Sequence, residues 1–565
     1  MRTRSVTSTT SSCSFGPLPM ILPLLRRLRL RETIDALVPV TGRAAVTHGQ
    51  VIEALVLNRL ISPRALHGVE DWSRSFAIQD ALGIEPSDLN DDRLTRALDA
   101  VFPVLEQIQG TLAWRAMEKF SIDPSWIHWD MTSFVFEGDY ADEGQDAQAP
   151  RVKLGKSKDR DAGLHRKQLQ VGYALASDAK VPFWHRTFPG NAAEVSEVSG
   201  VMKSLLDVVR RNKFTLIGDS KLISQTNLET AFQHGLYFVA PESRNRFSEW
   251  EFFQHRNEQG WEPWVVPPPI SEEGTDQSPA PKTASKKRRA SRTKKSSTIY
   301  LGFETQEMKR FNGKLERLRR LYIASSEERR ATRKNRKRQL QRFWDGVAKA
   351  QKNLGKYSYT TPTQVRGHIE RLIGKTDLQD VIGYRVTGRK QAHRDREIAT
   401  DLEISFDREA YKRKRQTDGV YTLLTNLPLE HSGQAILLRY KRQFLSERRF
   451  ADLKGPLRLR PLFLKKNRRL TALVSVMSFA LMVYCLLEYS IAKSLKETGS
   501  SIPRLYSQRP TVTPTARMMM EAFEFCIVTK ETDGDDVHFK VPPFNELQTL
   551  ILHHLGIEDP WSFLD

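Results

Sequence analysis

Two acidic residues occur in apolar runs of the sequence, where a charge is unusual. Asp130 lies inside the aromatic and β-branched run S-W-I-H-W-D-M-T-S-F-V-F-E-G, and Asp219 ends the short run K-F-T-L-I-G-D. A carboxylate in an apolar strand is costly unless a cation pairs with it, and ligands of α/β sheets gather beyond the carboxyl ends of strands. Both acids are therefore candidate metal ligands. The alternatives are a hydrogen-bonded core acid for Asp130 and a helix N-cap for Asp219.

A third candidate acid lies in a charged segment from Gln434 to Lys454, which is predicted to be a helix because Gly455-Pro456 follows it. Offsets of three, seven and fourteen residues from Tyr440 fall within one stripe of a helix that turns about 100° per residue. That stripe carries a phenol, an amide, a carboxylate and an ammonium: Tyr440, Gln443, Glu447 and Lys454. Such a face suits metal and phosphate binding, and the alternative is a solvated charged surface.

The helix resembles the Tyr-x2-Arg-x3-Glu-x6-Lys signature of one branch of bacterial insertion-sequence transposases. Tyr440, Glu447 and Lys454 match at the family's spacing, and W-D-M-T-S and L-I-G-D-S resemble its two Asp strands. F-P-G-N, D-G-V-Y-T-L-L-T-N and R-P-L-F-L are similar to further segments, so the resemblance runs from about residue 20 to the C-terminus. The family's Arg position is Gln443, with Arg442 beside it. Glutamine can donate a hydrogen bond to phosphate but brings no charge.

The resemblance implies a DDE transposase with an RNase H-like fold, whose catalytic acids and metal ligands are Asp130, Asp219 and Glu447. They would hold two Mg²⁺ ions, with Mn²⁺ able to substitute, for strand cleavage and 3′-OH strand transfer. Asp130 would bridge the two ions. The implied partners are double-stranded DNA, as element ends and target, and a second copy of the chain in a homodimer. The implied DNA contacts are Tyr440, Arg442, Gln443 and Lys454.

The 565 residues are enough for several domains. Paired strands followed by alternating strands and helices predict an α/β protein with a mixed sheet. We expect an N-terminal helical domain at 1–118, with a role in binding DNA ends as one option, and the two parts of the catalytic domain at 119–243 and 428–565. The second part would hold the Glu helix and a C-terminal helical region. A β-rich insertion domain would occupy 244–427, including a basic disordered loop at 267–298 and a charged helical stretch at 303–352.

The charge balance favours a polyanionic partner. Lys and Arg number 88 against 67 Asp and Glu, a net charge of +21. Basic side chains release counterions when they bind phosphates, so nucleic acid is favoured over an anionic membrane surface. The three cysteines lie far apart, which argues against a zinc site or a disulfide framework and fits a cytoplasmic location. Leu470 to Ile491 approaches membrane-spanning length, but we expect a buried helix carrying Ser475, Ser478 and Glu488.

Three rival functions follow from the same sequence. A catalytically silent DNA-binding relative would keep the basic surface and tolerate Gln443. A metal-dependent nuclease would cut DNA without joining it. A membrane protein would require the 470–491 run to span lipid.

Overall fold

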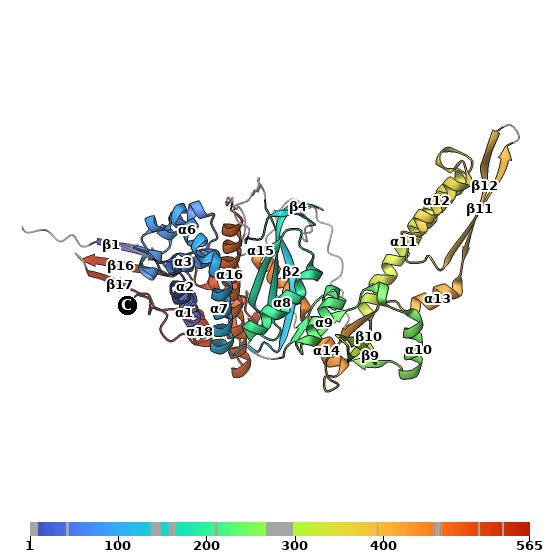
Figure 1. Ribbon diagram of the computed structural model, residues 1–565. Helices are drawn as coiled ribbons and strands as arrows, with labels where there is room; N and C mark the ends of the chain where they lie inside the picture. The colour runs from blue at the N-terminus through green and yellow to red at the C-terminus, as the bar shows by residue number, and fades with distance from the viewer. Residues whose placement is uncertain are drawn as a thin grey trace, which may run out of the picture.

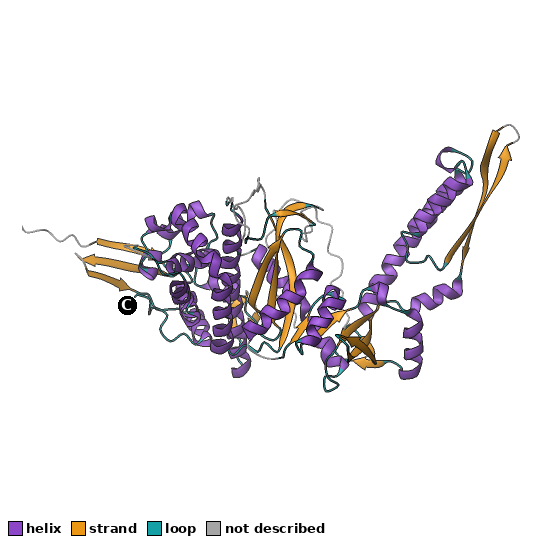
Figure 2. Cartoon of the chain, viewed as in Figure 1, coloured by secondary structure: helices purple, strands orange, loops and turns teal. Residues whose placement is uncertain are grey.

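The structure is a computed structural model that describes residues 9–40, 45–136, 148–156, 165–209, 213–266, 298–391, 394–455, 457, 464, 466–506, 509–533 and 536–564. Except for Thr298, the basic segment expected to be a loop lies outside these ranges, as does most of R-P-L-F-L. The described chain has a helical part, a mixed sheet and a projecting arm (Figures 1 and 2).

A ten-stranded mixed sheet forms the centre of the molecule, which confirms the expected α/β class. Its order is β3-β4-β2-β6-β7-β13-β10-β9-β8, with β5 also paired to β4. The strands are β2 (Trp126–Val135), β3 (Lys153–Gly155), β4 (Arg166–Ala176), β5 (Val181–Pro189), β6 (Thr215–Ile217), β7 (Tyr237–Pro241), β8 (Glu262–Trp264), β9 (Tyr300–Phe311), β10 (Lys314–Ser325) and β13 (Val420–Thr425). The neighbours β2, β6 and β7 run parallel, whereas β4 and β13 are antiparallel to the strands they join. Helices α8 (Glu194–Val209), α9 (Gln225–Gln233) and α10 (Glu249–Gln259) connect these strands.

The helix expected from residue 303 is wrong in its first half, where β9 and β10 form a long hairpin. Asn312 and Gly313 make its turn with φ of 48° and 80°, the left-handed conformation that favours Asn-Gly. The many charged residues of this segment masked the apolar pattern that predicts a strand. Side chains such as Leu321 and Ile323 are buried in it. The helix begins only at Ser326, as α11 (Ser326–Lys352).

The Glu-bearing helix is also not continuous. It consists of α14 (Gly433–Tyr440), a 3₁₀ turn η7 (Lys441–Gln443) and α15 (Phe444–Lys454). The first segment packs against β7 and β9, whereas α15 packs against β2 and α16 (Asn467–Thr498). A 3₁₀ helix turns about 120° per residue instead of about 100°, so the three residues of η7 rotate α15 by about 60° relative to a continuous helix. This rotation allows α14 and α15 to pack against different elements. The stripe predicted from helical spacing is therefore interrupted between Tyr440 and Glu447.

The expected buried helix over 470–491 is confirmed as part of α16. It is long and apolar enough to cross a membrane, but its most apolar window is 100% buried within the molecule. Ser475 and Ser478 hydrogen-bond to His185 and Tyr173 at 3.0 and 2.8 Å, and Glu488 pairs with Arg449. Against it pack the N-terminal helices α1 (Leu18–Leu28), α3 (His48–Ile61), α6 (Asp91–Val101) and α7 (Leu105–Phe120). Helices α2 (Leu30–Leu37), α4 (Val69–Ser75) and α5 (Ile78–Leu82) pack on α3.

The C-terminal region contains strands that were not expected there. Beside α17 (Ala516–Ala522) and α18 (Glu546–Leu555) lie β14 (Ile502–Tyr506), β15 (Arg509–Thr511), β16 (Ile527–Asp533) and β17 (Asp536–Lys540). Strand β16 pairs with β17 on one side and with β1 (Thr9–Ser14) on the other. The polar alternation of these short strands gave no apolar run from which to predict them.

The region expected as an insertion contains both sheet strands and the arm. Strands β8, β9, β10 and β13 extend the central sheet, because β13 pairs with β7. The arm consists of α11, α12 (Pro362–Ile373), the hairpin β11 (Ile382–Gln391) and β12 (Arg394–Phe406), and α13 (Arg408–Gln416), and it projects away from the rest (Figure 1). It has a separate core, to which Phe343, Val365 and Leu402 belong.

Stability is expected to depend on pH through Glu53 in α3, which is only 5% exposed. Burial raises its pKa from 4.5 to about 7, and Glu32 and Asp35 add to the rise against the opposing charges of Arg31 and Arg26. The folded state then holds its proton more tightly than the unfolded state, so stability falls as pH rises from about 4.5 to 7. Glu53→Gln should add up to about 3 kcal/mol at pH 8 and much less at pH 5.

Thermal melts at the two pH values check this expectation. Glu118→Gln, at an exposed position on α7, is the matched control. An equal gain from Glu53→Gln at both pH values would contradict it.

Candidate active site at the strand ends

The parallel pairing of β2 and β6 places Asp130 and Asp219 side by side. Trp126, Ile127 and His128 pair with Thr215, Leu216 and Ile217, and the same register carried two residues further puts Asp130 level with Asp219. Neighbouring residues of paired strands point to the same face of a sheet. Asp219 itself lies two residues beyond the end of β6, so it is the continued register that relates it to Asp130.

The face that carries Asp130 is covered by α15 and α16, because Tyr173, the partner of Asp130 on β4, contacts Phe450 and Ser478. Helix α14 lies over the start of β2. His128 shares this face with Asp130 because side chains alternate along a strand. Burial lowers the pKa of His128 to about 3, helped by the charges of Arg442 and Arg439. Trp126, on the same face, lies 5.3 Å from the Arg439 guanidinium. On the opposite face Trp129 packs over Gly172, where an added Cβ would lie 2.1 Å from the indole ring.

Asp219 is held by its own turn and by a lysine. Its Oδ1 accepts a 2.9 Å hydrogen bond from the Lys221 backbone N–H, so the N-cap role considered from the sequence is present. The Lys221 ammonium lies 3.5 Å from Asp219 Oδ2 and pairs with the buried carboxylate of Glu194. Burial acts to lower the pKa of Lys221, but the contacts with Glu194 and Asp219 outweigh it and raise that pKa. A cation therefore already faces Asp219.

Sequence reasoning missed Lys221 and Glu194. Lys221 follows Asp219 by two residues in G-D-S-K and could have been noticed, but Glu194 begins a distant helix and gave no signal. Beside them is a pocket of 190 Å³ whose lining includes Ser220, Ser224 and Arg246. Hydroxyl and cationic groups of this kind can hold phosphate oxygens.

Tyr440 lies close enough to Asp219 for the carboxylate charge to affect the pKa of the phenol. Burial raises the pKa of Tyr440 to about 12, and Asp219 and Glu328 contribute. Arg442 and Arg439 both pair with Asp178 in the turn between β4 and β5. Burial acts to raise the pKa of Asp178, but hydrogen bonds from these two arginines lower it. Arg442 thus has a protein partner, while Gln443 is half-buried in η7.

Glu447 is placed differently from the two strand acids. It is exposed on α15, and Lys454 is half-buried at the end of that helix. Among the residues that the structure describes, no three His, Cys, Asp or Glu side chains lie close enough together to hold a metal ion. Asp130 and Asp219 are thus the two candidate ligands that the continued register of β2 and β6 brings to one level. Such a pair is still a fitting donor set for Mg²⁺, which proteins often bind through one or two carboxylates plus substrate phosphates and water.

Comparison with known proteins gives three findings. No curated protein matches the chain. The chain is similar, at 10% identity and a TM-score of 0.38, to the piggyBac transposase in its synaptic complex with hairpin DNA, over 88% of this chain and 79% of that one. Residues 11–107 match a family model described as a domain of unknown function, DUF4277.

Proposed function

We propose that the chain is a DNA transposase of the DDE class, which cleaves DNA strands and joins the 3′-OH of an insertion sequence to a target. The observation that carries the proposal is the parallel pairing of β2 and β6, whose register, continued two residues past the end of β6, brings Asp219 level with Asp130. The Tyr440, Glu447 and Lys454 spacing and the net charge of +21 support it. The proposal includes a homodimer on double-stranded DNA in the cytoplasm.

In this proposal Asp130 and Asp219 hold Mg²⁺, with Glu447 as the third ligand once substrate is bound. The metal supplies Lewis-acid stabilisation of phosphate oxygens and an activated water or 3′-OH. Lys221 neutralises Asp219 in the metal-free protein, and its ammonium would compete with a metal ion for that carboxylate. Tyr440 and Lys454 orient the DNA strand near the carboxylates, and Gln443 donates a hydrogen bond rather than a charge.

The test is cleavage of the DNA that flanks this gene by the purified protein, with and without Mg²⁺. Metal-dependent cuts at the element ends, followed by joining to a target plasmid, are the expected result. Cuts without any joining would indicate a nuclease. Absence of cuts in Mg²⁺ and in Mn²⁺ would overturn the proposal.

A second candidate is a DNA-binding relative without cleavage activity. It is favoured by Gln443 at the position of an arginine and by the Lys221 ammonium 3.5 Å from Asp219. DNA binding without cutting would favour this candidate. Cleavage restored by Gln443→Arg would then show that the missing positive charge is the cause.

A further inference from the structure

We propose that one face of the arm helix α11 binds the phosphate backbone of duplex DNA. This face, the basic stripe, consists of exposed side chains: Arg330, Lys334, Lys337, Arg338, Arg342, Lys349 and Lys352. At 100° per residue they fall within about 140° of the helix circumference. Asp345 is the acid within this face, and its carboxylate accepts a hydrogen bond from Gln341. The choice of DNA as the partner rests on the proposed function. The ability of these side chains to bind phosphates does not.

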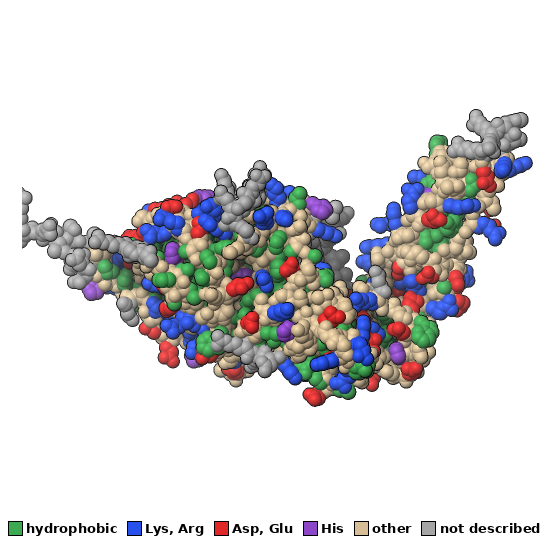
Figure 3. Space-filling model, viewed as in Figure 1, with side chains coloured by type: hydrophobic (Ala, Val, Ile, Leu, Met, Phe, Trp, Pro, Cys, Tyr) green, Lys and Arg blue, Asp and Glu red, His purple; other side chains and the backbone are tan. Residues whose placement is uncertain are grey.

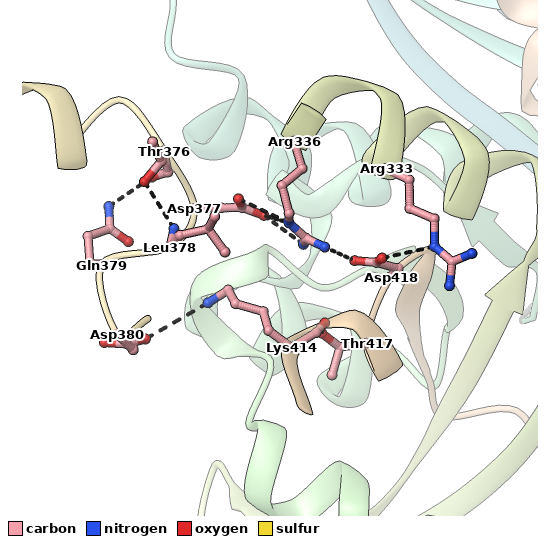
Figure 4. A network of polar contacts seen from close by, with 10 residues as sticks. All are labelled: Arg333, Arg336, Thr376, Asp377, Leu378, Gln379, Asp380, Lys414, Thr417 and Asp418. Atoms are coloured by element: carbon pink, nitrogen blue, oxygen red, sulfur yellow. Dashed lines mark hydrogen bonds and ion pairs between the residues drawn. The ribbon is translucent and has the colours of Figure 1, made fainter. Parts of the chain in front are cut away.

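The other side of α11 is committed to the arm itself. Phe343, Val347 and Ala350 are buried in the arm's core. Two arginines on this side are also neutralised within the protein (Figure 4). Arg336 pairs with Asp377 at 2.8 Å and with Asp418, and Arg333 lies 3.3 Å from Asp418. The basic residues of α11 are thus divided between a neutralised inner side and a charged outer one.

Four of the outer side chains differ in this respect. Within the described residues, Lys334, Lys337, Arg338 and Arg342 form no ion pair. Folding the arm does not require these charges, because the buried side already fixes the helix. Closely spaced like charges on one helix repel one another and are mildly destabilising. A polyanion laid against the stripe would relieve that repulsion.

The dimensions of the stripe fit a DNA duplex. From Arg330 to Lys352 it spans about 33 Å at 1.5 Å per residue, close to the roughly 34 Å of one turn of B-DNA. An α-helix also fits the major groove of B-DNA, whereas the major groove of duplex RNA is too narrow. Figure 3 shows Lys and Arg side chains along the edge of the arm that faces the body, across an open hollow. DNA held there would lie between the arm and the part of the chain that carries the sheet.

The experiment measures binding of the full chain to a duplex of about 30 base pairs of arbitrary sequence, in EDTA so that no cleavage occurs. The variant is Lys334→Gln, Arg338→Gln and Arg342→Gln, which keeps good helix formers on an exposed face. The matched control removes three exposed charges elsewhere: Arg64→Gln, Lys203→Gln and Lys496→Gln. Thermal melts verify that both variants are folded.

Each phosphate contact contributes about 0.9 to the slope of log K against log salt concentration. The stripe variant should lower that slope by roughly 2 to 3 and weaken binding on the order of tenfold to a hundredfold at low salt. The control should stay near the wild type. An unchanged slope, an equal loss in the control, or a loss confined to single-stranded DNA or duplex RNA overturns the inference. These measurements need no cleavage. Failure of the transposase proposal would appear as absence of cutting in Mg²⁺, whereas failure of this inference would appear as an unchanged salt slope in EDTA.

Discussion

Asp219→Asn is expected to reduce Mg²⁺-dependent strand cleavage by about 10³-fold or more, because the amide cannot neutralise a metal ion as a carboxylate does. Asparagine is as good an N-cap as aspartate, so the hydrogen bond from the Lys221 backbone N–H should survive. The fold and the DNA affinity in EDTA should therefore stay close to wild type. Cleavage of labelled flanking DNA over a range of Mg²⁺ concentrations gives the measurement.

The matched control is Asp207→Asn, an exposed carboxylate near the other end of α8 from Glu194. It should cut like the wild type, whereas Asp130→Asn should resemble Asp219→Asn. Full cleavage by either strand variant would falsify the assigned roles. Glu447→Gln is expected to lose cleavage as well, because Glu447 is the proposed third ligand. Full cleavage by this variant would leave only the two aspartates as proposed ligands.

Arg336→Met is expected to destabilise the arm by up to about 3–5 kcal/mol, the usual cost of breaking a buried ion pair, with Arg333 left as the remaining partner of Asp418. The Asp418 side chain is fully buried, and Arg336 joins it to Asp377 in the loop after α12 (Figure 4). These contacts connect α11 to both ends of the segment that carries the hairpin. Faster hydrogen exchange throughout α12, β11 and β12, with the exchange of α16 unchanged, is the expected readout.

Lys412→Ala provides the comparison for this prediction. Lys412 and Glu409 pair on the exposed surface of α13, with 69% and 73% of their side chains accessible, and such pairs contribute less than about 1 kcal/mol. Combining Arg336→Met with Asp418→Asn should recover part of the loss, since the buried carboxylate that only Arg333 would still neutralise is then gone. Unaltered exchange in Arg336→Met would show that the arm does not depend on this network.

The parts of the fold that the sequence predicted are those with strong apolar patterns. The runs around Asp130 and Asp219 became neighbouring strands, and the apolar run at 470–491 became a buried helix. The hairpin β9–β10 was missed because charged residues are interspersed with the apolar ones that mark a strand, although Asn312-Gly313 was a usable turn signal.

The candidate site was predictable only in part. Asp130 within its apolar strand and Asp219 after a short apolar run follow from local sequence, but their common level depends on the register between β2 and β6. The break at η7 arises because α14 and α15 pack on different surfaces, which no helical spacing reveals. The ion pair between Lys221 and Glu194 joins segments that are not adjacent in the chain, and no sequence pattern near either residue predicts it.

The pairing of β1 with β16 has a consequence for how the protein is made. About 500 residues separate the two strands, so a ribosome adding 5–20 residues per second needs roughly 25–100 s to reach the second after the first. Helix α16, on which the N-terminal helices pack, is likewise synthesised late. Throughout that interval the nascent N-terminal helices expose apolar surface, so we expect ribosome-associated chaperones to hold them until the C-terminal strands emerge.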